Sequence, residues 1–221
     1  MRDQAEKLRE LVREREETGR CRVLAVTSGK GGVGKTNLAV NLAVQLSRRG
    51  KRVVLVDLDL GLANADVLFN VDARHNLAHA VLGQKTLEEV LVEVAPGLRL
   101  LPGSSGVSRI ANLSDTEREA LLTGLEAVEA DADFLVVDTG AGISSNVVRF
   151  ACAADETIVV TTPEPTSVLD AFAMIKMIAN WRLPERLRLV INQARDRGEA
   201  RLVTDKIVTV SRQLLKAPVE K

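Results

Sequence analysis

The sequence is poor in aromatic residues, which make up 2% of its 221 residues and include no tyrosine. Proteins that bind single-stranded nucleic acid stack the bases on aromatic side chains, so that function has no strong signal here. There is also no excess of charge, because 30 Lys and Arg residues balance 30 Asp and Glu residues. This balance argues against a broad basic surface for nucleic acid.

Cysteines and long apolar runs are scarce as well. Cys21 and Cys152 do not form a C-x-x-C pair, which favours buried thiols in a reducing compartment over zinc or iron–sulfur ligation. His75 and His79 could share a helix face, but no third ligand follows them, and we interpret them as surface residues. No apolar run approaches the ~20 residues of a membrane helix, and the charged N-terminus is unlike a signal peptide. We therefore expect a cytoplasmic protein.

A glycine-rich segment lies between an expected strand and an expected helix. Gly29 to Thr36 match the phosphate-loop pattern G-x-x-x-x-G-K-[ST]. An apolar segment at 22–27 precedes the loop, and leucines at helical spacing follow it as far as Gly50. This order directs backbone N–H groups and a helix N-terminus at an anion. The predicted nucleotide contacts in this segment are Gly29, Lys30, Gly31, Gly32, Val33, Gly34, Lys35, Thr36 and Asn37.

Two residues at the end of the loop have predicted chemical roles. Lys35 would bridge the β- and γ-phosphates, and the hydroxyl of Thr36 would ligate Mg²⁺. We therefore predict a Mg²⁺-dependent nucleotide hydrolase whose catalysis depends on positioning and charge neutralisation. Lys30 is an addition, because the ordinary loop does not need a lysine after its first glycine.

Three aspartates lie where expected strands end. Asp57 and Asp59 close the strand at 53–57, and Asp138 closes the strand at 134–138. A carboxylate at this position beside a phosphate loop binds Mg²⁺ directly or through water, and another can orient the attacking water. Each aspartate alone could instead cap a turn or a helix. Together they predict a metal and hydrolysis site.

Strands and helices alternate along the rest of the chain. Apolar strands separated by amphipathic helices predict an α/β fold, a P-loop NTPase with a mostly parallel sheet and helices on both faces. Further strands are expected at 98–101, 157–161 and 187–192. Helices are expected at 77–82, 87–92, 115–130, 145–153, 167–181 and 199–215. After the last helix we expect no further strand.

Residues 1–20 are predicted to form a separate helical arm, with 21–221 as the nucleotide-hydrolysing domain. Asp3 and Glu6 have capping-box spacing, and an apolar stripe of Ala5, Leu8, Leu11 and Val12 follows among charged residues. Composition leaves two readings open. The arm is either a solvated helix or a helix that docks its stripe in a partner's groove.

At these motifs the chain resembles the MinD/ParA family of deviant P-loop ATPases, whose loop K-G-G-x-G-K-T is present from Lys30 to Thr36. The resemblance covers about residues 20 to 216. It implies ATP and Mg²⁺ as cofactors and a homodimer that closes on ATP. In such a dimer Lys30 would contact phosphate in the nucleotide of the partner subunit.

The resemblance also implies roles beyond the loop. Asp59 would orient the hydrolytic water, Asp57 would lie beside it in the first switch, and Asp138 would act in the second switch and through water on Mg²⁺. Asn192 would contact adenine, and the segment from Pro163 and Glu164 to Thr166 would line the base and ribose pocket. The implied catalytic residues are Lys30, Lys35, Asp59 and Asp138, and the implied metal residues are Thr36, Asp57 and Asp138.

Within the family, the stretches at 57–66 and 164–167 resemble the flagellar number regulators of the FlhG/FleN (YlxH) group. The arm matches their D-Q-A-x-x-L-R element, which implies partner-binding roles for Asp3, Gln4, Ala5, Leu8 and Arg9. The implied partner is the signal-recognition-type GTPase FlhF. Flagellar switch (C-ring) proteins, or a transcription activator restrained by a non-hydrolysing adaptor, stay open. A division-site or partition ATPase is the alternative within the family.

One departure concerns the end of the chain. Members of this group continue with further structure and a C-terminal amphipathic membrane helix, so we expect that the C-terminal part of the domain is missing here. Peripheral contact with the inner face of the membrane is left open, although its targeting helix is absent from the sequence. The helix at 199–215 is interpreted as a covering helix of the core rather than a membrane binder.

Overall fold

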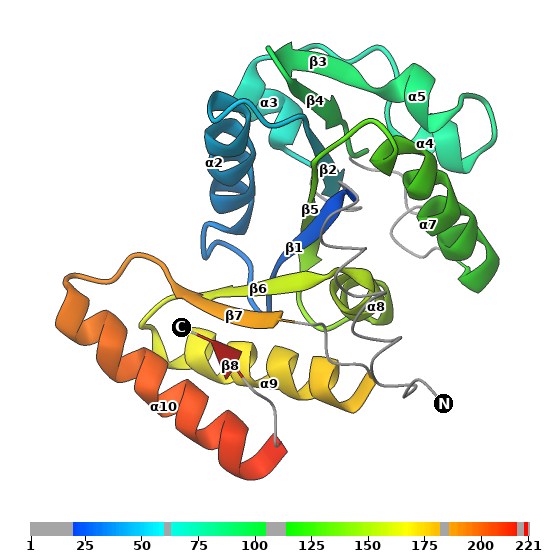
Figure 1. The fold of residues 1–221 in the computed structure, drawn as a ribbon. Helices are drawn as coiled ribbons and strands as arrows, with labels where there is room; N and C mark the ends of the chain where they lie inside the picture. Colours follow the sequence, from blue (N-terminus) through cyan, green and yellow to red (C-terminus); the bar gives the residue numbers. More distant parts are fainter. Residues whose placement is uncertain (1–19, 60–62, 105–113, 182–185, 216–218, 221) are drawn as a thin grey trace, which may run out of the picture.

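The computed structural model describes residues 20–59, 63–104, 114–181, 186–215 and 219–220. The arm residues Asp3, Gln4, Ala5, Leu8 and Arg9 therefore lie outside the described residues, and their partner-binding role stays a prediction. In the described part, one sheet has the order β3-β4-β2-β5-β1-β6-β7-β8 (Figure 1). Its strands are β1 (Arg22–Ser28), β2 (Val53–Leu58), β3 (Val92–Ala95), β4 (Leu98–Leu101), β5 (Phe134–Ala141), β6 (Glu156–Thr161), β7 (Arg186–Ile191) and β8 (Val219–Glu220).

The sheet is parallel except for β3, which pairs antiparallel with β4. Helices follow most of the strands, as expected for right-handed crossover connections between parallel strands. They are α2 (Lys35–Arg48), α3 (Ala65–Phe69), α4 (Leu77–Val81), α5 (Leu87–Val90), α7 (Asp115–Glu129), α8 (Ser145–Ala153), α9 (Pro165–Trp181) and α10 (Arg197–Leu215). The predicted α/β fold with a mostly parallel sheet is confirmed.

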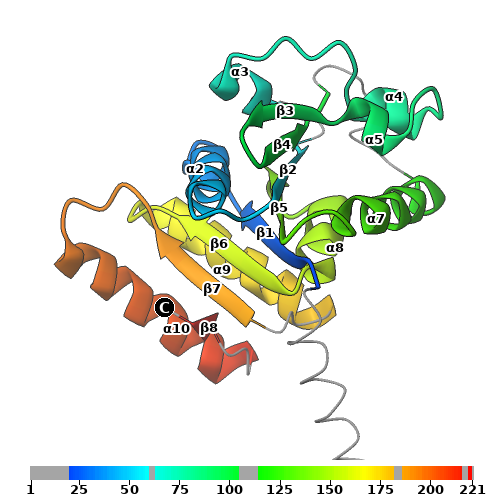
Figure 2. The same ribbon diagram turned by 45° about the horizontal axis from the view of Figure 1, so that its top comes forward.

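Both faces of the sheet are covered. In β2, Val53 and Leu55 belong to the core cluster under α2, whereas Val54 and Val56 belong to the cluster under α7 and α8. This alternation follows from the two-residue period of a strand. Figures 1 and 2 show α2 on one side of the sheet and α7, α8 and α9 on the other, with α10 beside α9. Because both faces are buried, the strands read as nearly continuous apolar runs.

Two expectations about element boundaries are wrong. The segment 87–92 is not one helix, because α5 ends at Val90 and Leu91 has an extended backbone that leads into β3. A strand does follow the last helix, because β8 pairs parallel with β7 and buries Val219. By contrast, the helix expected at 115–130 is present as α7, and it begins with a capping box in which Ser114 Oγ accepts from the N–H of Glu117 at 3.2 Å.

A buried carboxylate joins three neighbouring strands at the amino-terminal edge of the sheet. Glu156, at the start of β6, forms ion pairs with Arg22 of β1 and Arg188 of β7. The Nε of Arg188 lies 2.6 Å from Oε2 of Glu156, and Arg186 Nη1 lies 3.8 Å from Oε1. A buried carboxylate needs such partners, because an unpaired buried charge is strongly destabilising.

The scarce residue types occupy ordinary positions. Cys21 and Cys152 are buried and form no disulfide, as predicted, and burial raises the pKa of Cys21 to about 12. His75 and His79 are half-buried rather than exposed, with ring centroids 5.2 Å apart. Among the described residues, no group of three potential ligands could hold a metal ion without help from a bound molecule. Within the same residues, no helix has the length and apolar character needed to cross a membrane.

Candidate functional site

The glycine-rich loop connects the end of β1 to the first turn of α2. Its backbone is held by the bond from Ser28 Oγ to the carbonyl oxygen of Lys30 at 2.9 Å, and by that from the N–H of Leu38 to the carbonyl of Gly34 at 3.0 Å. Gly34 has φ +89°, a conformation that residues with a Cβ rarely adopt. The loop thus ends on the N-terminus of a 14-residue helix, where backbone N–H groups lack partners within the helix.

Lys35 and two of the predicted carboxylates meet at the base of this loop. The Nζ of Lys35 lies 2.7 Å from Oδ1 of Asp138, 4.0 Å from Oδ2 of Asp59 and 3.4 Å from Oγ1 of Thr36. The side chain of Lys35 is 6% exposed and that of Asp138 is completely enclosed. The structure therefore brings together Lys35, Thr36, Asp59 and Asp138 as the sequence predicted.

The two carboxylate oxygens of Asp138 differ in their hydrogen bonding, because Oδ1 is bonded to Lys35 and Oδ2 is not bonded. Burial raises its pKa, while the nearby charge of Lys35 lowers it in part. Its Oδ2 is buried and has no hydrogen-bond partner. A buried oxygen of this kind is costly unless a ligand completes its bonds. The arrangement fits a Mg²⁺-bound water, because oxygen atoms of carboxylates, hydroxyls and water are the ligands that Mg²⁺ takes.

Asp57 lies on the neighbouring strand, where it is paired in register with Asp138. Its two oxygens accept bonds from the N–H groups of Asp59, Asn64 and Ala65, at 3.0, 3.0 and 3.1 Å. Burial is the largest cause that raises the pKa of Asp57, to about 6, against the lowering effect of these bonds. The metal role predicted for Asp57 stays a prediction, and the structure gives this carboxylate another set of partners.

Lys30 lies at the outer rim of the loop and contacts the segment before α9. Its Nζ is 2.8 Å from Oε1 of Glu164 and 2.8 Å from Oγ1 of Thr166. The Lys30 ammonium lowers the pKa of the Glu164 carboxyl. Glu164 and Thr166 both belong to the segment 163–166 that was predicted to line the base and ribose pocket. A Cβ on Gly29 would lie 2.1 Å from the carbonyl oxygen of Asp170, so α9 packs directly against the loop.

Asn192, the residue predicted to contact adenine, lies against the glycine-rich loop. The side-chain amide of Asn192, after β7, donates to the carbonyl oxygen of Val33 at 2.8 Å. A Cβ on Gly34 would lie 2.3 Å from this amide nitrogen, so Asn192 lies against the loop itself. Pro163 is partly exposed beside Glu164, and Asn37 is exposed on the first turn of α2. Their contacts with the nucleotide stay predictions.

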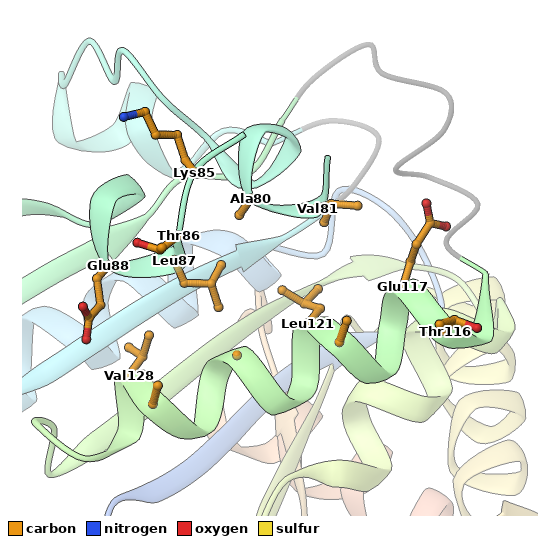
Figure 3. Close-up of a pocket in the computed structure, with 13 residues that line it drawn as sticks. Ala80, Val81, Lys85, Thr86, Leu87, Glu88, Thr116, Glu117, Leu121 and Val128 are labelled. Carbon is orange, nitrogen blue, oxygen red and sulfur yellow. The ribbon is translucent and has the colours of Figure 1, made fainter. Parts of the chain in front are cut away.

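A separate groove of about 570 Å³ lies between α4, α5 and α7, outside the loop region. Figure 3 shows Leu87 of α5 facing Leu121 and Val128 of α7 inside it. Its wall is apolar, with charged side chains such as Lys85 and Glu88 at its edge. None of the predicted nucleotide contacts lines it, and it offers no cluster of donors for phosphate.

A loop of backbone N–H groups on a helix N-terminus, with a buried lysine and two carboxylates at its base, defines a P-loop nucleotide-binding domain. A model of the AAA domain matches residues 21–191. The flagellum site-determining protein YlxH of Helicobacter pylori is 39% identical over 194 residues, which cover 88% of this chain and 65% of that protein. The antiactivator FleN of Pseudomonas aeruginosa is 42% identical over 193 residues, covering 87% and 69%.

Solved structures agree with this class. The septum site-determining protein MinD of Pyrococcus horikoshii, in complex with Mg-ADP, superposes with a TM-score of 0.73 at 25% identity. The match covers 84% of this chain and 76% of that one. The chain belongs to the MinD/ParA family of P-loop ATPases. Within that family, the flagellum site-determining protein YlxH and the antiactivator FleN are similar to it, and the chain spans about two thirds of their length.

Proposed function

We propose that this chain binds Mg²⁺-ATP at the P-loop and hydrolyses it. The observation that carries the proposal is the position of Lys35, whose ammonium is 2.7 Å from Asp138 and 4.0 Å from Asp59. These carboxylates stand where the lysine would otherwise meet phosphate oxygens. The similar Pyrococcus MinD, solved with Mg-ADP, supports the choice of cofactor.

The residues of the site divide the work of hydrolysis. The N–H groups of the loop and the ammonium of Lys35 would hold the phosphates, while Thr36 and Oδ2 of Asp138 would hold Mg²⁺ directly or through water. Bound Mg²⁺ would supply positive charge that neutralises the phosphate oxygens. Asp59 is less buried than Asp138, with 24% of its side chain exposed. It can therefore reach a water at the open side of the site and orient it for attack.

We further propose that ATP closes a homodimer in which Lys30 leaves Glu164 and contacts the nucleotide of the second copy. Lys30 is suited to this because its side chain is one third exposed at the rim, unlike Lys35. The experiment is light scattering after size exclusion, with ATP, for the parent, Lys30→Ala and Asp59→Ala. We expect a dimer from the parent, none from Lys30→Ala, and a longer-lived dimer from Asp59→Ala. Equal monomer–dimer cycling in all three would overturn the switch.

The output we propose is regulation of flagellar number and placement through an FlhF-type GTPase, with the arm at residues 1–20 acting on the partner. Its support is the similarity to the flagellum site-determining protein YlxH. The test is GTP hydrolysis by the GTPase in the presence of the parent or of a variant without residues 1–20. Stimulation by the parent alone is expected. Equal stimulation by both would remove the role of the arm, and no stimulation by either would favour a division-site or partition ATPase.

A second candidate is an adaptor that restrains a transcription activator without hydrolysing ATP. The similar Pseudomonas protein is an antiactivator, which favours it. ATP turnover measured with and without a flagellar transcription activator separates the two. Turnover that is absent under both conditions would support the adaptor.

A further inference from the structure

We propose that Asp57 is a positioning residue that fixes both ends of the loop carrying Asp59, and that it acts on hydrolysis through Asp59 rather than through Mg²⁺. This inference rests on the proposed ATP hydrolysis. Its structural part, however, concerns the protein without nucleotide and can be tested there.

The bonds of Asp57 span the loop from its start to its end. Oδ1 accepts from the N–H of Asp59 at 3.0 Å, which fixes the residue that carries the predicted hydrolytic carboxylate. Oδ2 accepts from the N–H groups of Asn64 and Ala65 at 3.0 and 3.1 Å, which fixes the start of α3. One buried side chain therefore holds two backbone segments that are five residues apart.

Among the described residues, Asp57 accepts from the N–H groups of Asn64 and Ala65 at the start of α3, whereas Asp66 accepts from the adjacent N–H of Val67. Asn64, its N-cap, forms no capping bond with its own side chain. The first N–H groups of a helix need acceptors, and a carboxylate at this end is also favoured by the helix dipole. Asp57 supplies that acceptor from β2, so a five-residue helix that is marginal by itself becomes tied to the sheet.

Gly103 closes the other side of this arrangement. A Cβ at this position would lie 2.6 Å from Cβ of Ala63, 2.7 Å from the carbonyl oxygen of Asp57 and 3.1 Å from its Cγ. The segment after β4 can therefore approach Asp57 only because residue 103 has no side chain. The carboxylate is enclosed on this side, and its exposed fraction is 1%.

The consequence for chemistry lies in the position of Asp59. Its carboxylate is 4.0 Å from Nζ of Lys35, and its N–H is held by Asp57. A small displacement of a group that orients water lowers the turnover number without removing the phosphate contacts. Asp57→Asn should have this effect, because an amide offers one acceptor atom and turns an NH₂ group toward the other backbone donors.

The first experiment uses the protein without nucleotide. Hydrogen exchange at the amides of Asn64 and Ala65 is compared in the parent, Asp57→Asn and Asp66→Asn. Asp66 is the matched control, because its carboxylate accepts only from the adjacent N–H of Val67 at the same helix end. We expect exchange to be faster by about tenfold in Asp57→Asn, as for the loss of a bond to a charged acceptor, and unchanged in Asp66→Asn. Unchanged exchange in Asp57→Asn would overturn the proposal.

Gly103→Ala is the second variant, in case Asp57→Asn does not fold. Its added methyl group would displace Ala63 and Asp57, although residue 57 would keep its carboxylate group. Faster exchange at Asn64 and Ala65 is expected here too. If Gly103→Ala folds and these amides keep the rates of the parent, the inference is wrong.

The second experiment measures ATP turnover against Mg²⁺ concentration. For Asp57→Asn we expect a turnover number about tenfold lower, with the half-saturating Mg²⁺ and the KM for ATP unchanged. Added to Asp59→Asn, the same substitution should cost nothing further, because both act on one step. A tenfold rise in half-saturating Mg²⁺, or additive losses, would instead make Asp57 a metal ligand. A parent without turnover would remove the proposed function and leave the exchange result standing.

Discussion

The ammonium of Lys35 lies 2.7 Å from Oδ1 of Asp138, and both side chains are almost entirely enclosed. Two opposite charges are therefore buried at the base of the loop before any nucleotide binds. The attraction between the two charges offsets the free-energy cost of removing each of them from water, which would be strongly destabilising for either charge alone. Phosphate binding must turn the ammonium of Lys35 away from Asp138. A bound ligand therefore has to replace the interaction free energy of this ion pair.

Lys35→Met should destabilise the nucleotide-free protein by about 3 to 5 kcal/mol, because it leaves a buried carboxylate without its partner. Lys35→Met combined with Asp138→Asn should recover most of this loss, since the uncompensated charge is gone. Urea unfolding of the two variants and the parent measures the difference. Equal stability of the single and double variants would contradict the role of the pair. Neither variant is expected to hydrolyse ATP.

Gly34→Ala should lower both the thermal stability and the affinity for ATP. The added Cβ meets the amide of Asn192 at 2.3 Å, and the backbone at φ +89° is strained for any residue with a side chain. Gly31→Ala is the matched control, because a Cβ there meets nothing within 4 Å. Its melting temperature should equal that of the parent. Calorimetry and a fluorescent nucleotide report the two effects, and equal melting temperatures for both variants would contradict this account.

The raised pKa of Asp57 predicts a pH dependence of stability. Its pKa is about 6 in the fold against 3.8 for a free carboxyl, so between these values the folded chain binds more protons than the unfolded one. The free energy of unfolding contributed by Asp57 therefore falls as the pH rises through that range. Relative to Asp57→Asn, the parent should lose about 2 kcal/mol between pH 4 and pH 7. Urea unfolding at intermediate pH, without nucleotide and with a chelator, provides the measurement. If the difference in free energy of unfolding between the parent and Asp57→Asn stays constant with pH, the predicted pH dependence is wrong.

Glu164→Gln should favour the proposed dimer, because it removes the ion pair between Lys30 and Glu164 and leaves the bond to Thr166 as the second restraint. Because this ion pair is exposed, the melting temperature of the monomer should hardly change. The measurement is the ATP concentration at half-maximal dimer, by light scattering. Thr166→Val, which removes the second bond of Lys30 and keeps the ion pair, should give a smaller shift in the same direction. An unchanged midpoint in Glu164→Gln would show that this contact does not hold Lys30 back.

The sequence predicted the central sheet because its strands are buried on both faces and read as apolar runs. It missed β3, whose four residues are only partly buried at the edge. Leu91 and Val92 continue the apolar spacing of α5, so periodicity alone extended that helix into the strand. It missed β8 because two residues after a proline carry no strand pattern.

The candidate site shows the same division. The loop residues, Asp59 and Asp138 are predictable because they follow apolar strand residues in the sequence, although β5 continues past Asp138 to Ala141. The partners of Lys30 lie 134 and 136 residues away along the chain, and only the packing of α9 against Gly29 brings them close. The backbone bonds of Asp57 are equally hidden, since an aspartate that binds metal and one that caps a helix look alike in sequence.

The ion pairs of Glu156 have a consequence for motion. Glu156 holds the amino-terminal ends of β1, β6 and β7 together, while the loops that approach the nucleotide leave the opposite ends of the same strands. Strands joined by ion pairs at one end are restrained from sliding past one another. Internal rearrangement caused by ATP would then be restricted to the loops at the opposite ends of these strands. The sheet itself would move only as a rigid body.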